Sequence, residues 1–100
     1  NCLHIWIFDM AYVVSTTRRF DKCIEKMKKR GYPMDELRRV IVLLMETGVL
    51  PVKYKPHKLT GNHKGQWECH IKPDWLLVWE QNDNELTLLL LETGTHSDLF

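Results

Sequence analysis

The amino-acid sequence predicts an α+β fold with a short N-terminal strand, a two-helix hairpin, an antiparallel three-stranded meander and a short C-terminal tail. Apolar residues recur at helical spacing in two segments of the first half, whereas three segments of the second half alternate or are continuously apolar. Helices followed by a run of strands, without βαβ alternation, are typical of this class. With 100 residues, the chain can bury one small hydrophobic core.

Local chemistry predicts the first strand and the first helix. Residues 11–15, AYVVS, are mainly β-branched and aromatic, which favours a strand. Thr16 or Thr17 can then cap the first free amides of a helix. Gly31 ends that helix, because glycine adopts the left-handed conformation without a Cβ clash. The apolar stripe of the helix consists of Phe20, Ile24 and Met27.

A second helix is predicted between Pro33 and Gly48. Its first turn contains Asp35 and Glu36, which complement the positive end of a helix dipole. Its apolar stripe consists of Leu37, Val40, Ile41, Leu44 and Met45. Residues 49–65 follow as a long polar connection for which the sequence predicts no regular element. Loops of this length in a small domain usually carry function.

Three strands complete the predicted sheet. They are residues 66–72, 75–80 and 85–91, separated by a tight turn at Pro73-Asp74 and a hairpin loop at 81–84. The middle strand is almost entirely apolar, as expected for a central strand with both faces covered. The first of the three alternates, which assigns Trp67, Cys69 and Ile71 to one face and Glu68, His70 and Lys72 to the other.

Residues 10–100 are expected to form a single domain, with residues 1–9 as a non-native or disordered leader ahead of Met10. The alternative for the leader is a genuine extra strand over Leu3 to Phe8. The three cysteines have no metal or disulfide spacing, which suggests reduced thiols in a cytoplasmic protein. No apolar run approaches the roughly 20 residues that a membrane-spanning helix needs.

The net charge of +1 conceals a strong asymmetry along the chain. Residues 1–72 carry all 14 Lys and Arg against 7 acids, whereas residues 73–100 carry 6 acids and no Lys or Arg. Clustered positive charge is typical of a surface that binds phosphate or an acidic partner. Two solvated helix faces would produce the same pattern, so charge alone leaves both interpretations open.

Histidines are concentrated in the second half of the chain, at positions 57, 63, 70 and 96. Imidazole titrates near pH ~6.5, so histidines can act as acid and base near neutrality. Together with lysines and Asp74, they suit cleavage of RNA by its own 2′-hydroxyl. In that reaction one group removes the 2′ proton, another protonates the leaving 5′-oxygen and cations stabilise the growing charge, without a metal.

Each of these residues also has a purely structural interpretation. A histidine in a loop is often only solvated, Asp74 can form an Asx turn, and tryptophans often serve packing. Metal binding is a separate alternative. The chain has no C-x-x-C or H-x-x-x-H pair, and Cys69 and His70 are expected on opposite faces of one strand, which disfavours joint ligation.

Three motifs in order resemble the YafQ branch of the RelE superfamily, the toxins of type II toxin–antitoxin systems. They are PHKLTG at residues 56–61, HIKPDW at 70–75 and GTHSDLF at 94–100. The resemblance extends over residues 10–100 and is densest over 54–100. It implies a RelE-like α+β toxin that cleaves mRNA in the ribosomal decoding site without metal or other cofactor. It also implies neutralisation in a hetero-oligomer by a DinJ-like antitoxin encoded beside it.

The resemblance also implies roles for individual residues. His96 corresponds to the likely general acid of the family, and His57, His70 and Asp74 to base, charge-stabilising or positioning groups. Trp75 and Phe100 are implied to stack on or position bases, which requires little sequence specificity. The basic residues expected to contact the substrate are Lys58, Lys64 and Lys72.

Glu92 departs from the family pattern and is a further expected substrate contact. Relatives typically carry an arginine there, whose guanidinium would clamp the scissile phosphate. A carboxylate would repel that phosphate, and the change from +1 to −1 beside it is worth on the order of several kcal/mol at a partly buried site. A loss of about 2–3 kcal/mol lowers a rate about 10²-fold. Glu92 is therefore a natural weakening, an introduced substitution that permits expression, or a change offset by another cation such as Lys64 or Lys72.

The sequence leaves three alternative functions for this protein. The first is an endoribonuclease toxin that acts on ribosome-bound mRNA and is impaired to some degree by Glu92. The second is a catalytically inactive module that binds the antitoxin and joins a repressor complex. The third is a metal-dependent hydrolase, whose activity a chelator would abolish.

Overall fold

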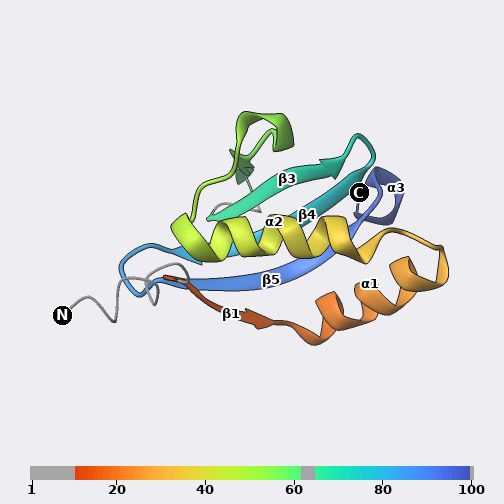
Figure 1. Ribbon diagram of the computed structural model, residues 1–100, viewed down its shortest axis with the longest axis horizontal. Coiled ribbons are helices and arrows are strands. Elements are labelled where there is room, and N and C mark those ends of the chain that lie inside the picture. The colour runs from red at the N-terminus through yellow and green to blue at the C-terminus, as the bar shows by residue number, and fades with distance from the viewer. Residues whose placement is uncertain (1–10, 62–64, 100) are drawn as a thin grey trace.

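The computed structural model describes residues 11–61 and 65–99 and has a five-stranded mixed sheet in the order β1-β5-β4-β3-β2 (Figure 1). The strands are β1 (Val13–Thr16), β2 (His57–Lys58), β3 (Gln66–Lys72), β4 (Trp75–Asn82) and β5 (Thr87–Gly94). β1 pairs in parallel with β5, and all other neighbours are antiparallel. The predicted α+β class and three-stranded meander are confirmed. The expected leader, residues 1–9, lies outside the described residues.

Along the chain, two helices lie between β1 and the other strands of the sheet. α1 (Arg18–Lys29) is capped by Thr17, whose Oγ1 accepts a hydrogen bond of 3.0 Å from the Phe20 amide. α2 (Met34–Thr47) ends at Gly48, which has a φ of 74°. A Cβ at Gly48 would lie 2.6 Å from the Tyr12 ring, so the position requires glycine on steric grounds as well.

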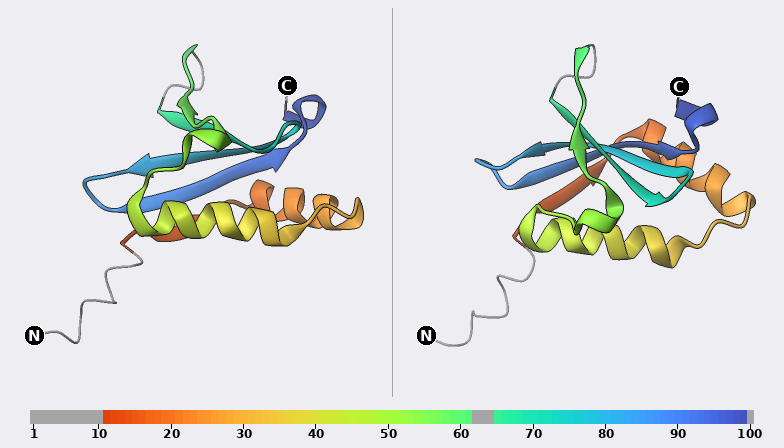
Figure 2. Two further views of the ribbon diagram at one scale, coloured as in Figure 1. Left: turned by 45° about the horizontal axis from the view of Figure 1, so that its top comes forward. Right: turned by 90° about the horizontal axis from the view of Figure 1, so that it is seen from above.

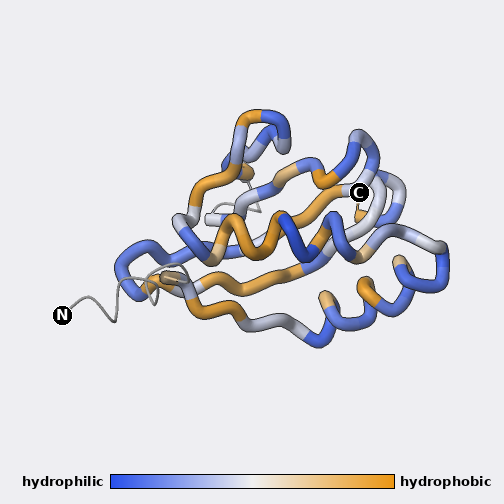
Figure 3. Tube along the Cα trace, viewed as in Figure 1, coloured by the Kyte–Doolittle hydropathy of each residue, from blue (hydrophilic) through white to orange (hydrophobic). Residues whose placement is uncertain are grey.

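The core lies between α2 and the sheet, with α1 alongside the second half of β5. Apolar colour follows the middle strands and one stripe of α2 in Figure 3, with polar colour on the outer turns of α1. Buried core residues include Phe20, Met27, Leu37, Val40 and Leu44 from the helices and Cys69, Trp75, Leu77, Trp79, Leu88 and Leu90 from the strands. Burial raises the pKa of the Cys69 thiol to about 12, which makes this thiol unreactive at neutral pH.

Several segments differ from the prediction. β4 extends to Asn82, into the predicted hairpin loop 81–84, β5 begins at Thr87 and the expected tail contains the helix α3 (His96–Leu99). The connection 49–65 contains the 3₁₀ helix η3 (Val52–Tyr54) and the two-residue strand β2, which short patterns do not reveal. The last strand extends to Gly94 instead of ending at residue 91. Its register against β4 shifts, with Trp79 opposite Leu90 but Val78 opposite Glu92. A bulge adds one extra residue to a strand and so changes which side chains face the core. Here it turns the side chain of Glu92 away from the core.

The face of the sheet opposite α2, here called the open face, carries the other half of the strand residues. Glu68, Val78 and Glu92 form one row across β3, β4 and β5, while their neighbours Cys69, Leu77 and Thr93 face the core side. Figure 2 shows that α3 (His96–Leu99) and the segment around β2 stand on the side away from α2. No helix in the described part of the chain is long and apolar enough to cross a membrane.

Candidate functional site

A histidine–aspartate pair lies where the β3–β4 turn meets the end of β5. His96 Nδ1 lies 2.9 Å from Asp74 Oδ1, and the His96 backbone N–H donates to the same oxygen at 3.2 Å. An ionised carboxylate can only accept, so Nδ1 carries the proton in this contact. The hydrogen bond from the His96 side chain, followed by that from its backbone, lowers the pKa of Asp74. The pair brings together two residues that are 22 positions apart.

A second network fixes the short helix that carries His96. The Asp98 carboxylate accepts hydrogen bonds from the Thr95 amide at 2.9 Å and from Arg30 Nη1 at 2.7 Å. Lys26 Nζ lies 3.3 Å from the other carboxylate oxygen. The Arg30 guanidinium holds the pKa of Asp98 well below its usual range, with the Thr95 amide as the next cause. These contacts attach α3 to α1, and they fix the position of His96, the first residue of α3.

His70 lies beside this pair. Its ring centroid is 5.9 Å from that of His96, with the two planes tilted by 50°. Its Nδ1 lies 3.3 Å from the carbonyl oxygen of Pro73, which can only accept, so Nδ1 is the donor. The structure therefore brings three of the predicted site residues, His70, Asp74 and His96, to one end of the open face.

His57 occupies a different position, at the sheet edge. Its Nε2 lies 3.1 Å from Glu68 Oε1, and its Nδ1 lies 3.0 Å from the carbonyl oxygen of Lys55. The Glu68 side chain is only 8% exposed, and its Oε2 is buried without a hydrogen-bond partner among the described residues. Sequence reasoning placed Glu68 on the same face as His70 but did not select it. The signal that could have identified Glu68 is a carboxylate in the middle of an alternating strand, next to residues that face the core.

Glu92 forms an ion pair instead of presenting a free carboxylate. Its Oε1 lies 2.8 Å from Nε of Arg19, at the start of α1, in an ion pair whose geometry is not that of a hydrogen bond. The exposed fractions of the Glu92 and Arg19 side chains are 14% and 68%. A hollow of about 370 Å³ adjoins the pair and is also lined by Gln66, Leu91 and Leu99. Arg19 was missed because nothing in the sequence links it to a residue 73 positions later. The ion pair moderates the repulsion that an isolated carboxylate would exert on a phosphate.

Trp75 was expected to stack on bases or to position them. It is fully buried, its Nε1 donates to Thr93 Oγ1 at 2.9 Å, and its ring lies edge-on to Tyr32. This burial favours a positioning role over direct stacking. Lys58 is exposed, with Nζ 5.5 Å from the Trp67 ring centroid, and Lys72 is exposed beside His70. Lys64 and Phe100 lie outside the described residues, as does His63.

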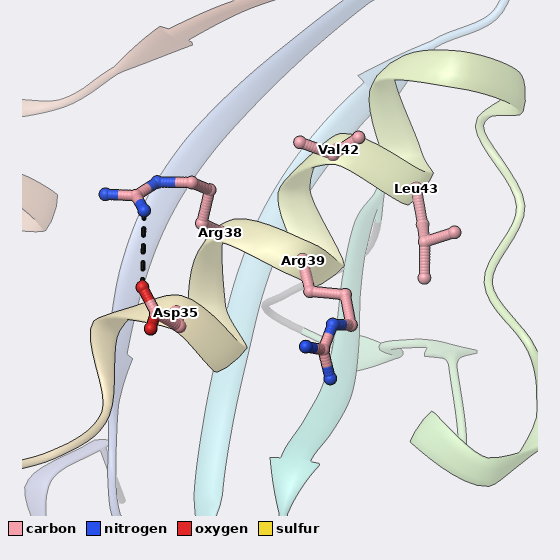
Figure 4. Close-up of a pocket in the computed structure, with 5 residues that line it drawn as sticks. All are labelled: Asp35, Arg38, Arg39, Val42 and Leu43. Carbon is pink, nitrogen blue, oxygen red and sulfur yellow. Dashed lines mark hydrogen bonds and ion pairs between the residues drawn. The ribbon is translucent and has the colours of Figure 1, made fainter.

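Another hollow lies on the outer surface of α2, away from the histidines (Figure 4). It has a volume of about 350 Å³ and is lined by Asp35, Arg38, Arg39, Val42 and Leu43. Asp35 and Arg38 are paired across it at 3.3 Å, so part of its charge is already neutralised. It contains no group able to serve as both acid and base near neutral pH.

Metal ligation was the separate alternative. Among residues 11–61 and 65–99, no three or more His, Cys, Asp or Glu side chains are grouped to hold a metal ion. The Asp74, His70 and His96 cluster instead shows direct contacts between its own side chains and backbone. Its geometry favours acid–base chemistry by the residues themselves.

The family model described as "Bacterial toxin of type II toxin-antitoxin system, YafQ" matches residues 12–100. The chain belongs to the YafQ toxin family. The mRNA interferase toxin YafQ of Escherichia coli K12 is 37% identical over 84 residues, which cover 82% of this chain and 88% of the relative. This confirms the resemblance drawn from the three motifs.

Solved structures agree with the YafQ assignment. The toxin in the E. coli DinJ–YafQ toxin–antitoxin complex matches with a TM-score of 0.82 and 32% identity, over 90% of this chain and 98% of that one. A metal-bound toxin from Helicobacter pylori matches with a TM-score of 0.81 and 39% identity, over 89% and 99%. The strand, two helices and mixed five-stranded sheet are thus the fold of YafQ toxins.

Proposed function

We propose that this YafQ family member is an endoribonuclease that cleaves ribosome-bound mRNA in the cytoplasm and is neutralised by a DinJ-like antitoxin. The observation that carries this proposal is the Asp74–His96 pair with the His70 ring beside it. Such a cluster supplies an oriented acid and a second imidazole at one point of the open face. The relative from E. coli, an mRNA interferase that forms a complex with DinJ, supports the choice of substrate and partner.

His96 acts as the general acid in the proposed reaction. The Asp74 carboxylate accepts a hydrogen bond from Nδ1–H of His96, orients the ring and stabilises the imidazolium. The proton on Nε2 can then pass to the leaving 5′-oxygen. His70, on the other side, accepts the proton of the 2′-hydroxyl. The 2′-oxygen then bonds to phosphorus as the bond to the 5′-oxygen breaks, which leaves a 2′,3′-cyclic phosphate and a 5′-hydroxyl. No metal takes part.

The remaining polar groups bind and position the RNA. His57, held by Glu68, adds charge stabilisation when it is protonated, and Lys58 and Lys72 neutralise the backbone. Phe100 and Lys64 keep their expected substrate contacts as part of the proposal. Trp75 supports the Asp74 turn from below through its bond to Thr93.

Glu92 determines how active this chain is. The ion pair brings the two-thirds exposed guanidinium of Arg19 next to Glu92, the position that the resemblance assigns to an arginine in relatives. Arg19 joins Lys72 and Lys64 as a cation that can offset Glu92, although a paired guanidinium attracts phosphate less than a free one. We therefore expect cleavage by this chain to be weakened and to increase in the Glu92→Arg variant.

The experiment is mRNA cleavage in a purified translation system by this chain, its Glu92→Arg variant and its His96→Ala variant. General acid catalysis contributes about 10²–10⁴-fold, so His96→Ala should lose at least 10²-fold in rate with its thermal unfolding unchanged. Full activity of His96→Ala would refute the assigned acid. Cleavage unaffected by a chelator would dispose of a metal-dependent hydrolase.

The second candidate function is an inactive module that binds the antitoxin as part of a repressor complex. The observation in its favour is the Glu92–Arg19 pair, in which a carboxylate and a guanidinium are held by each other and not free for a phosphate. Tight antitoxin binding with cleavage only by the Glu92→Arg variant would establish this function. Clean cleavage by the unaltered chain would exclude it.

A further inference from the structure

A separate cavity adjoins the histidine cluster at the β3–β4 end of the open face. Its volume is about 220 Å³, and it is lined by Lys53, Lys55, His70, Ile71, Lys72 and Pro73. Three lysines from two segments therefore converge on one cavity, together with a histidine of the proposed catalytic cluster.

The chain builds this cavity by a constrained turn. Tyr54 in η3 is buried, and Lys53 Nζ lies 5.0 Å from the centroid of its ring. Lys55 adopts a left-handed conformation with a φ of 50°, and its amide donates to the Val52 carbonyl at 2.9 Å. A non-glycine residue in this conformation is strained, and the buried Tyr54 and the hydrogen bond of the Lys55 amide hold it there. The Lys55 carbonyl also contacts His57 Nδ1 at 3.0 Å, which joins the turn to the start of β2.

The charge of the cavity is not balanced within the described part of the chain. None of the ammonium groups of Lys53, Lys55 and Lys72 has a carboxylate within 4.0 Å there, whereas Lys26 and Arg30 are both paired with Asp98. The nearest buried acid on β3, Glu68, contacts His57 instead. Unpaired ammonium groups beside a cavity attract a phosphate, because Lys presents a compact charge with three donors.

We propose that Lys53, Lys55 and Lys72 form a second phosphate subsite, which holds the RNA backbone at a nucleotide next to the cleaved bond. This rests on the proposed endoribonuclease function. His70 lines the cavity and lies beside His96, so a strand with its reacting phosphate between the two histidines passes the cavity with a neighbouring phosphate. The subsite reads no base, and its contribution is affinity and placement of the strand.

The test compares two charge-matched double variants in a His96→Gln background, which prevents cleavage. One is Lys53→Gln/Lys55→Gln, and the control is Lys28→Gln/Lys29→Gln on the exposed last turn of α1. Binding of a short unstructured RNA is followed by fluorescence anisotropy over a sodium chloride series. Circular dichroism and thermal melting verify that each variant is folded.

The pocket variant should bind RNA at least about fivefold more weakly than the control, and its slope of log affinity against log salt should fall by about 0.7 for each lost phosphate contact. Equal changes in both variants, or no change in the pocket variant, would overturn the subsite. Inorganic phosphate is titrated in parallel. Saturable phosphate binding that is lost in the pocket variant, with RNA affinity unchanged, would identify a free-anion site and also overturn the proposal.

Cleavage in the purified translation system separates the two proposals. If the unaltered chain cleaves and a Lys53→Gln/Lys55→Gln variant with His96 intact cleaves equally well at every RNA concentration, the subsite fails while the endoribonuclease function stands. If the unaltered chain does not cleave but the pocket variant loses RNA affinity as expected, the function fails while the subsite stands.

Discussion

The two faces of the sheet are built from alternate residues of the same strands, yet their chemistry differs. On the α2 side, Trp75, Leu77 and Trp79 are buried in an apolar core. On the open face, Glu68 and Glu92 contact partners from other segments, His57 and Arg19, while His70 contacts the carbonyl of Pro73 in the adjoining turn. Core packing is non-directional, so many apolar sequences satisfy it, whereas each polar contact of the open face needs a specific partner.

The open face itself carries its charge unevenly across the strands. Beside His70, on the β3 side, an acid–base pair stands near three lysines without carboxylate partners in the described structure. On the β5 side, two residues before Gly94, Glu92 is paired with Arg19. The two sides therefore differ in whether their charges are paired, and the following predictions test this contrast in order of expected effect.

Replacing Trp75 with alanine should have the largest effect, on the free energy of unfolding. A fully buried tryptophan lost from a core costs about 3–5 kcal/mol, and its indole also satisfies Thr93. Urea denaturation measures the change. Trp67→Ala, at a partly exposed ring stacked on Trp79, is the matched control and should cost clearly less. Equal losses for both variants would contradict the assignment of Trp75 to the core.

Replacing Asp74 with asparagine should affect activity more than stability. Without the carboxylate that orients its ring, His96 is a poorer general acid, so cleavage should slow by about 10- to 100-fold. The lowered pKa of Asp74 keeps it ionised at neutral pH. The deficit should therefore be complete at pH 7 and diminish only below about pH 4, the ordinary range of aspartate. Asp35→Asn, on the outer surface of α2, is the control and should cleave normally.

Replacing Asp98 with asparagine should change the pH dependence of stability. The pKa of Asp98 is lowered in the folded protein, and in the unfolded chain it is about 3.9. Its stabilisation is thus present above about pH 4 and is lost as the pH falls towards the lower folded-state value. The variant should be less stable by about 1–3 kcal/mol at pH 7, with a smaller difference at pH 3. A constant difference across this range would exclude the Arg30–Asp98 ion pair as the cause.

The smallest effect should come from the Arg19–Glu92 pair. Because Arg19 is 68% exposed, the coupling free energy should be only about 0–1 kcal/mol. A double-mutant cycle of Arg19→Gln and Glu92→Gln, measured by urea denaturation, tests this. A coupling well above 1 kcal/mol would mean that the pair is structurally essential.

Much of the fold could be predicted from local patterns. The Thr17 cap, the Gly48 end of α2 and the alternating faces of β3 follow from backbone conformation and side-chain periodicity, which act over a few residues. The bulge at the end of β5 could not be predicted, because it depends on the register against β4. The strand β2 also escaped detection, since two residues form a strand only when a neighbour pairs with them.

By itself, the sequence determined the α+β class, the positions of the helices and the candidate residues His57, His70, Asp74 and His96, since residue type and short-range order fix these. Only the tertiary structure decided which of them meet. It paired His96 with Asp74 and placed His57 apart from them, in contact with Glu68. It also buried Trp75 and paired Glu92 with Arg19. The physical reason is that charge and hydrogen bonding act over a few ångströms in space, whereas their partners lie tens of residues apart in the chain.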